Sequence, residues 1–242
     1  MTRHLHIICA AAPWPPDNSM AIDIFYKMQA LHKAGIKIHL HYFCTNPNCH
    51  PTELNKYCES VHPYPCGKQK TNFAGINSRP GGAGNDSIAN AVSNDLYPVL
   101  FEGINCTGTL QQIAAADRKV VIRMYNDECR YYDHLKKSSG LFFQKIRLNQ
   151  CAREMKKYED ALPQKNCHYV FSTPGNATSF RDAHPSTNVH YLPLFTPFHT
   201  VKSKTGVGSF CLYHGDLSDP CNEKAAIWLL SKVFNDINIP LV

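Results

Sequence analysis

The first 44 residues combine two hydrophobic patterns that belong to different kinds of secondary structure. "HLHIICAA" (residues 4–11) predicts a buried strand, and "IKIHLHYFC" (36–44) predicts a strand with one polar face. Between them, apolar residues recur at helical spacing over about 19–34, and Gly35 is suited to end the helix. A strand, a helix and a strand in this order form a βαβ unit, which requires a parallel sheet.

The alternation of strands and helices continues along the chain. We expect strands at 61–65, 97–103, 119–124, 168–173 and 188–194, and helices near 105–117, over 130–162 and between the last two strands. These elements predict an α/β fold, a Rossmann-like parallel sheet with helices on both faces over residues 1–200. A linker (201–207) and the first βαβ of a second, incomplete Rossmann-like domain (208–242) are expected to follow.

Charge and composition narrow the classes of protein. The chain has 25 Lys and Arg against 19 Asp and Glu, and this mild excess fits a small anionic substrate or an anionic membrane at least as well as nucleic acid. The sequence contains no run of 18 apolar residues, so no transmembrane helix is expected. The apolar stretch at 5–12 is short for a signal sequence. We therefore expect a cytoplasmic protein, without a nucleic-acid partner, whose 11 cysteines are free and mostly buried.

A cluster of cysteines and histidines raises the alternative of a zinc-bearing structural module. It consists of Cys44, Cys49, His50, Cys58, His62 and Cys66. The spacing is irregular and contains no pair of cysteines with two residues between them (C-x2-C), so we expect ordinary thiols and no bound zinc. His39 and His41 fall on the polar face of the strand at 36–44, where we expect them to be exposed.

The helix expected at 130–162 has a basic polar side. Its cationic residues are Lys136, Lys137, Lys145, Arg147, Arg153, Lys156 and Lys157. A solvated helix face explains this pattern, and contact with anionic lipid headgroups is the alternative.

Four loops that follow predicted strands are rich in small and polar residues. They are "PWPPDNS", "FEGIN", "RMYNDECRYY" and "YHGDLSD". In open α/β sheets ligands bind at the carboxyl ends of the strands, so the four loops together predict a ligand site, although each alone could be an ordinary turn. The glycine fingerprints of dinucleotide dehydrogenases and P-loop nucleotidases are absent from the sequence, so neither class is expected.

These loops and their surroundings resemble the amino-terminal half of a GT-B glycosyltransferase, of the bacterial family-4-like ("glycosyltransferase family 1") type. The matching segments are "PWPPDNSMAIDIFYKMQALHKAGIKIHLHYF", "YPVLFEG", "RMYNDECRYYDHL" and "LYHGDLSDPCNEKAA". The resemblance implies two Rossmann-like domains that face a cleft, the first for the acceptor and the second for the nucleotide-sugar donor. It implies a hexosyltransferase-like enzyme acting on a hydroxyl of a glycan or lipid-linked acceptor. No metal or cofactor is implied, and the setting is the cytoplasm or the inner face of the membrane.

The resemblance also implies roles for particular residues. Asp17 and Glu128 are the candidates for catalysis, by holding sugar hydroxyls or orienting the acceptor. The candidate substrate-binding residues are Ser19, Glu102, Gly103, Arg123, Tyr125, Asn126, His214, Gly215 and Asp216. Because each follows a strand at the same sheet edge, we expect Asp17, Asn126, Glu128 and His214 to converge on one cleft.

Several positions depart from the family pattern. Ser19 and Met20 stand where the family commonly has a pair of glycines, and Tyr125 stands where it has a histidine. Tyrosine, with a pKa of about 10, is a poor proton acceptor at neutral pH. Asp216 and Cys221 lie near places that arginine and lysine often hold in related donor loops.

These departures keep a second interpretation open, that of a non-catalytic, truncated relative that binds a glycan or a partner. Residues 206–242 supply two strands and a helix of the expected donor domain. We therefore expect the chain as written to transfer sugar well below a normal rate, because the donor diphosphate would meet one loop of its site.

Overall fold

The computed structural model describes most of the chain. The described residues are 3–44, 46, 51–65, 86–114, 118–125, 131–132, 135–137, 139, 142–162 and 166–242. The chain divides into two compact units, Met1–Asp127 with Glu154–Pro197 and Glu128–Arg153 with Phe198–Val242.

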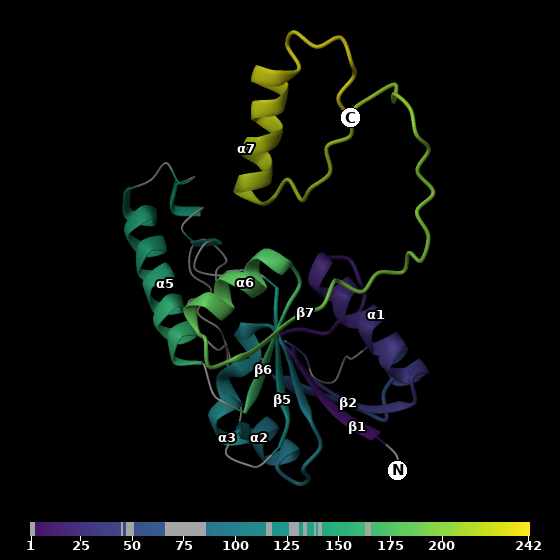
Figure 1. Cartoon of the computed structure of the whole chain (residues 1–242), viewed down its shortest axis with the longest axis vertical. Helices are drawn as coiled ribbons and strands as arrows, with labels where there is room; N and C mark the ends of the chain where they lie inside the picture. Colours follow the sequence, from purple (N-terminus) through teal and green to yellow (C-terminus); the bar gives the residue numbers. More distant parts are fainter. Residues whose placement is uncertain are drawn as a thin grey trace. The chain divides into compact units, whose positions relative to one another are not determined.

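The first unit is built on a seven-stranded sheet in which all neighbouring strands are parallel (Figure 1). The strands are β1 (Arg3–Cys9), β2 (Ile36–Cys44), β3 (Ser60–Pro65), β4 (Val99–Glu102), β5 (Val120–Met124), β6 (Cys167–Phe171) and β7 (Asn188–Tyr191). Their order across the sheet is β3-β2-β1-β4-β5-β6-β7. The predicted Rossmann-like parallel sheet is confirmed, and β2 has the predicted bounds.

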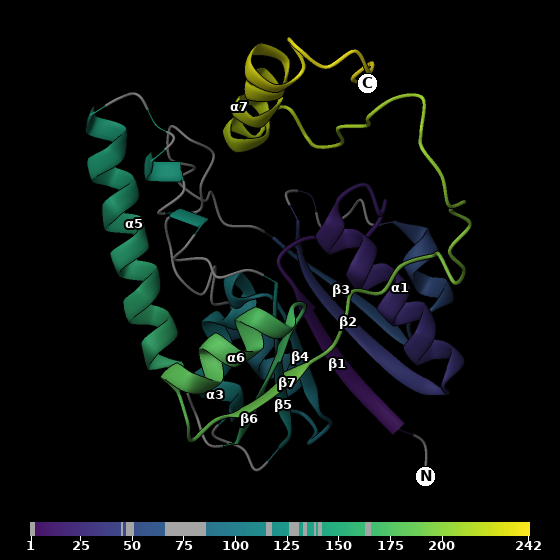
Figure 2. The same cartoon turned by 45° about the horizontal axis from the view of Figure 1, so that its top comes forward.

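Helices cover both faces of this sheet, as predicted. The α-helices are α1 (Ser19–Lys33), α2 (Asp86–Val92), α3 (Leu110–Ala114), α5 (Phe142–Ala161) and α6 (Pro174–Ala183), and the 3₁₀ helices are η1 (Thr52–Lys56) and η2 (Ile104–Thr109). In both cartoon views α1 lies on one side of the sheet and α3 and α6 lie on the other (Figures 1 and 2), and α2 lies beside α3 in Figure 1. Helix α1 begins where Asn18 Oδ1 accepts a hydrogen bond from the backbone N–H of Ala21, at 2.9 Å.

Alternation along the strands gives the two sheet faces different characters. The face toward α1 is apolar, and its core consists of Ile7, Cys9, Ile38, Leu40 and Tyr42 packed with Ile24, Phe25 and Met28. The opposite face of β1 and β2 carries histidines. The prediction that His39 and His41 are exposed is wrong, because this second face is also covered: His41 is 1% exposed and His39 is half-buried.

Two predicted helices differ from the structure. The helix expected at 105–117 is a 3₁₀ helix over Ile104–Thr109 followed by one short α-helix, and the Thr107 hydroxyl donates to the carbonyl of Ile104 within that 3₁₀ stretch. The helix expected at 130–162 is regular from Phe142 onward, and Ser139 is not helical. The sequence "SSG" just before that start has low helix propensity, which favours an interruption there.

In the second unit, α7 (Pro220–Trp228) continues into a π-helical turn, η3 (Leu229–Val233). Asp219 caps α7 through a 2.7 Å hydrogen bond from the backbone N–H of Cys221. The strands expected on either side of this helix are reduced to one parallel bridge between Cys211 and Leu241. Several apolar side chains of this unit are exposed, and they include Phe210, Leu212, Ile227, Trp228 and Leu230.

In the part of the chain that the structure describes, no helix is both long and apolar enough to span a membrane.

Candidate functional site

The carboxyl ends of the central strands meet at one edge of the sheet, as the loops predicted. Cys9, the last residue of β1, pairs with Glu102, the last residue of β4, and Glu102 pairs with Arg123 of β5. The segments that follow these strands therefore begin side by side. The segment after β1 contains Asp17, the segment after β4 begins with Gly103, and the segment after β5 begins with Tyr125.

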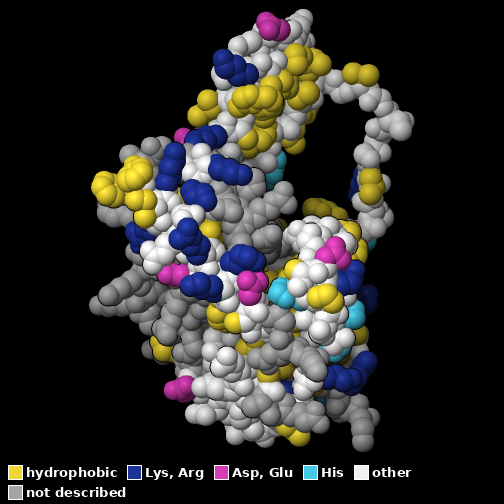
Figure 3. All heavy atoms as spheres, turned by 60° about the vertical axis from the view of Figure 1, so that its left-hand side comes forward, with side chains coloured by type: hydrophobic (Ala, Val, Ile, Leu, Met, Phe, Trp, Pro, Cys, Tyr) yellow, Lys and Arg dark blue, Asp and Glu magenta, His cyan; other side chains and the backbone are white. Residues whose placement is uncertain are grey.

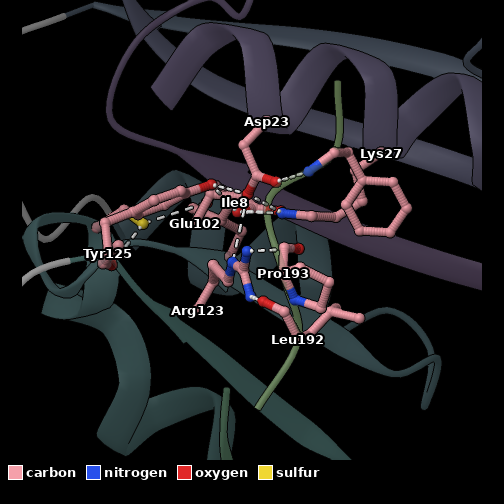
Figure 4. Close-up of polar contacts among 11 residues, drawn as sticks. Ile8, Asp23, Lys27, Glu102, Arg123, Tyr125, Leu192 and Pro193 are labelled. Atoms are coloured by element: carbon pink, nitrogen blue, oxygen red, sulfur yellow. Dashed lines mark hydrogen bonds and ion pairs between the residues drawn. The ribbon is translucent and has the colours of Figure 1, made fainter. Parts of the chain in front are cut away.

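Beneath this edge lies a buried network of four charged side chains (Figure 4). Lys27 Nζ lies 2.7 and 2.9 Å from the two carboxylate oxygens of Glu102 and 3.0 Å from Asp23 Oδ2. Arg123 Nε lies 3.3 Å from the same Asp23 oxygen. Each of the four side chains is at most 5% exposed. Two cations balance two anions, so the network buries charge without burying a net charge.

Three elements position this network. Asp23 and Lys27 are four residues apart on α1 and therefore lie on one side of the helix. Glu102 and Arg123 point to the α1 side of the sheet, where their charged groups reach that helix. The network thus ties α1 to β4 and β5 at the edge where a ligand is expected.

Tyr125 joins the network through its hydroxyl group. Its Oη lies 2.7 Å from Glu102 Oε2 and 2.9 Å from Asp23 Oδ2, so one proton faces two carboxylate acceptors. Burial raises the pKa of Tyr125 well above its ordinary value, and the charges of Glu102 and Asp23 raise it further. The hydroxyl is therefore a neutral donor directed into the network, and the expected role of Tyr125 in lining a cleft stays a prediction.

The same network holds the chain that leaves the sheet after β7. Arg123 donates from Nη1 to the carbonyl of Leu192 at 2.5 Å and from Nη2 to that of Pro193 at 3.1 Å. Asp23 Oδ1 accepts the backbone N–H of Phe195 at 2.6 Å. Burial alone would raise the pKa of Asp23, but Lys27, the Phe195 N–H and Arg123 outweigh it, and the net shift is downward.

Gly103 turns the chain out of β4. It has φ +102°, a conformation that L-residues with side chains rarely adopt, and its N–H donates to the carbonyl of Arg123 at 3.1 Å. A Cβ at this position would meet no atom within 4 Å. The requirement for glycine is therefore conformational, and the space beside its Cα is open.

Of the predicted catalytic pair, Asp17 lies in an exposed loop immediately before α1. Asn18 Nδ2 donates to Asp17 Oδ1 at 3.0 Å, and Ser19 is the exposed first residue of the helix. Glu128 and Asn126 lie outside the described residues. Their convergence with Asp17 stays a prediction.

His214, Gly215 and Asp216 lie in the second unit, in the turn before α7. Asp216 Oδ1 accepts the N–H and the hydroxyl of Ser218 at 2.9 and 2.7 Å, and these bonds lower the pKa of the Asp216 carboxyl. Asp219 caps the helix that follows. The turn therefore carries two carboxylates at the helix N-terminus, where a phosphate would otherwise be favoured.

Among the described residues, no group of three or more His, Cys, Asp and Glu side chains is arranged to hold a metal ion. Cys49, His50 and Cys66 of the zinc alternative lie outside the described residues.

Sequence reasoning missed Asp23, Lys27 and the segment at 192–195. A signal was present, because Glu102 ends an otherwise apolar strand and a buried carboxylate needs a cationic partner. An Asp and a Lys four residues apart beside the apolar stripe of α1 could have supplied that partner. Nothing in the sequence pattern indicates the contacts to the backbone of 192–195.

No protein-family model and no curated protein matches this chain. Among solved structures it is similar to UGT2 of Phytolacca americana complexed with UDP-2fluoro-glucose and pterostilbene, with 10% sequence identity and a TM-score of 0.46. The match covers 78% of this chain and 53% of that one, so the chain spans about half the length of its neighbour. At this level of similarity neither residue roles nor ligands transfer from one protein to the other.

Proposed function

We propose that this chain is the acceptor-side part of a GT-B-type glycosyltransferase, which moves a sugar from a nucleotide sugar to a hydroxyl of a glycan or lipid-linked acceptor. The observation that carries the proposal is the carboxyl edge of the parallel sheet. An exposed Asp17 loop and the open Gly103 turn lie there above a buried, charge-balanced network. The four sequence segments that resemble this enzyme type include the loops that follow β1, β4 and β5 at that edge.

The chemistry of transfer assigns different tasks to these groups. The acceptor oxygen bonds to the anomeric carbon, the bond from that carbon to the diphosphate breaks, and the nucleoside diphosphate and the proton of the acceptor hydroxyl are released. Asp17 is an exposed carboxylate that can accept a hydrogen bond from a sugar hydroxyl. Tyr125 cannot take a proton, because its pKa is raised and its hydroxyl already donates to a carboxylate. The network contributes rigidity, which keeps the edge preorganised.

The test is ligand binding and nucleotide release with matched variants. Saturation-transfer NMR with UDP-glucose, GDP-mannose and a set of oligosaccharides is compared for the wild type, Asp17→Asn and Asp182→Asn. Asp182 is the control, because it is exposed near the end of α6, which leads to the opposite edge of the sheet. We expect a sugar ligand to give a saturation-transfer signal with the wild type and with Asp182→Asn, and a weaker signal with Asp17→Asn. Equal signals in all three proteins, or none with any sugar, would contradict the proposal.

A non-catalytic, sugar-binding relative is the second candidate, and the turn before α7 favours it. The carboxylates of Asp216 and Asp219 oppose a donor diphosphate at that turn, and Tyr125 replaces a proton-accepting histidine. In this case a glycan saturates normally in the NMR experiment, while no nucleotide is released from any nucleotide sugar. Nucleotide release that depends on an added acceptor identifies the enzyme instead.

We also propose that the protein contacts a membrane surface peripherally. Figure 3 shows Lys and Arg side chains gathered along the outward side of helix α5. Helix α5 has five basic and three acidic residues, and its first turns expose Phe142 (70%), Phe143 (84%) and Ile146 (53%). Such a combination suits an anionic lipid surface. Cosedimentation with phosphatidylcholine vesicles, with and without phosphatidylglycerol, tests it, and binding should require the anionic lipid and weaken in Phe143→Ser.

A further inference from the structure

The sheet face opposite α1 carries a stack of histidines that no role above uses. It consists of His4 and His6 of β1, His39 and His41 of β2, and His62 of β3. The parallel register places His6 beside His39 and His41 beside His62. Neighbouring rings have their centroids 4.9 to 5.3 Å apart. The stack runs from the buried rings of His6 and His41 to the exposed ring of His62.

Hydrogen bonds determine which nitrogen carries the proton in each of the two buried rings, His6 and His41. Tyr64 Oη lies 3.0 Å from His41 Nδ1, His41 Nε2 lies 2.9 Å from His6 Nδ1, and His6 Nε2 lies 3.1 Å from Asp95 Oδ2. An ionised carboxylate only accepts, so His6 donates from Nε2 and its Nδ1 accepts from His41. His41 Nδ1 then accepts from the Tyr64 hydroxyl. Both rings are neutral in this arrangement, and each uses one donor and one acceptor.

A second set of bonds connects the outer rings through a serine. His4 Nδ1 lies 3.0 Å from His39 Nε2, and Ser60 Oγ lies 2.8 Å from both His39 Nδ1 and His62 Nε2. Ser60 and Tyr64 belong to β3, so side-chain bonds join this strand to β2. These bonds matter there, because β3 is an edge strand with Pro63 and Pro65, which have no N–H to donate to the ladder.

The stack has little capacity to balance positive charge. The described ionisable groups facing it are Asp95, Arg118, Tyr64, Tyr97 and the exposed Lys37–Glu59 pair. Asp95 already bonds to His6, and Arg118 adds a positive charge beside it. A proton on His41 Nδ1 would leave its bond to His6 and the bond from His6 to Asp95 in place, but it would remove the nitrogen that accepts the Tyr64 hydroxyl.

The direction of the ring pKa values agrees with this geometry. Burial lowers the pKa of His41 to about 3, with further lowering by His6, His62 and His39. Burial also lowers the pKa of His6, against the opposing effect of Asp95, and lowers those of His39 and His62. Once released into water, each ring takes up a proton with an ordinary pKa of about 6.5. Falling pH below that value therefore favours the released form.

We propose that the histidine stack is an acid-sensitive switch at the β3 edge of the sheet. With neutral rings, Ser60 and Tyr64 hold β3 against β2. Acidification releases β3 and protonates the stack, while the half of the sheet formed by β4, β5 and β6 stays folded. Each histidine that gains a proton on release multiplies the ratio of released to attached protein by up to about tenfold per pH unit.

The wild-type protein tests the proposal directly. Ring ¹⁵N NMR at pH 7.5 should show His6 and His41 with the proton on Nε2, and as the pH falls His41 should stay neutral in the attached state and take up a proton only in the released one. Hydrogen exchange, corrected for the intrinsic effect of pH, should show that residues 60–65 lose protection between pH 7 and 5 while β5 and β6 keep it. Protection of β3 that is independent of pH, or a His41 that titrates near pH 6.5 in the attached state, would overturn the proposal.

Two variants separate the stack from other histidines. His41→Phe keeps a ring but cannot gain a proton, so the acid release should become less steep by about one proton. His168→Gln is the control, because His168 and His190 form a similar stacked pair on β6 and β7 that is exposed. An equal change in both variants would contradict the proposal. If His41→Phe fails to fold, the tautomer and titration of the wild-type rings still decide.

Discussion

The hydroxyl of Tyr125 lies 2.7 Å from Oε2 of Glu102 and 2.9 Å from Oδ2 of Asp23, so it donates into the buried network of charged side chains. Phenylalanine at this position would keep the ring and remove a donor shared by two buried carboxylates. We expect Tyr125→Phe to lower the free energy of unfolding by about 1–3 kcal/mol, measured by urea denaturation. Tyr26→Phe, a partly buried tyrosine of α1 outside the network, is the control and should change it by less.

Lys27 balances two carboxylates, so its loss should cost more than the loss of one hydrogen bond. Lys27→Met leaves Glu102 and Asp23 with Arg123 as their remaining cation, and we expect a loss of about 3–5 kcal/mol in unfolding free energy. The double variant Lys27→Met/Glu102→Gln removes one charge of each sign. It should be more stable than Lys27→Met alone, and a purely additive loss would argue against a coupled network.

The lowered pKa of Asp23 predicts that the free energy of unfolding decreases at acid pH. Its folded-state pKa is lowered from 3.8, so the unfolded chain takes up its proton at a higher pH than the folded protein does. The stabilisation is present above about pH 4 and is lost as pH falls through the lowered value. Urea midpoints between pH 5 and pH 2.5 should fall less steeply in Asp23→Asn than in the wild type. Parallel curves would show that the Asp23 carboxyl is not perturbed.

Two glycines with equally open surroundings should respond in opposite directions to alanine. Gly103 has φ +102° and Gly175 lies in the first turn of α6, and a Cβ at either position meets no atom within 4 Å. Gly103→Ala should cost about 1–2 kcal/mol of backbone strain. Gly175→Ala should be neutral or stabilising by up to about 1 kcal/mol, because alanine favours the helix. Thermal or urea unfolding distinguishes the two.

Charge at the turn before α7 gives a test that concerns nucleotide binding alone. Asp216→Asn keeps the oxygen that accepts from Ser218 and removes the negative charge. If this turn approaches the donor diphosphate, affinity for UDP should rise a few-fold, since one unit charge about 5 Å away in water contributes about 1 kcal/mol. Asp236→Asn, an exposed carboxylate of the same unit, is the control. Identical titrations by calorimetry would remove His214–Asp216 from the donor site.

The sequence predicts the sheet well because its strands are short apolar or alternating runs and its helices have apolar stripes and capping residues. The bounds of β2 and the start of α1 at Ser19 follow from local patterns alone. The charged network does not, because its members are 4, 75 and 100 residues apart, and a carboxylate at the end of an apolar strand signals a buried partner without identifying it. Tyr125 and Arg123 were singled out by resemblance, but their inward orientation depends on the packing of α1.

The histidines show a related limit. Alternation placed His39 and His41 correctly on one face of β2, but alternation cannot tell water from a second protein layer. The partners of His41 on this face, His6 of β1 and Tyr64 of β3, come from neighbouring strands and are not visible in the sequence of β2 alone.

The bonds from Arg123 and Asp23 to the backbone at 192–195 have a mechanical consequence. Three hydrogen bonds, to two carbonyls and one amide, fasten the outgoing chain to β5 and α1. A pulling force applied beyond Phe195 would load these bonds before it reached the hydrogen-bond ladder of β7. In single-molecule stretching, the first rupture should therefore report the strength of these three hydrogen bonds, and not the strength of the pairing between β6 and β7.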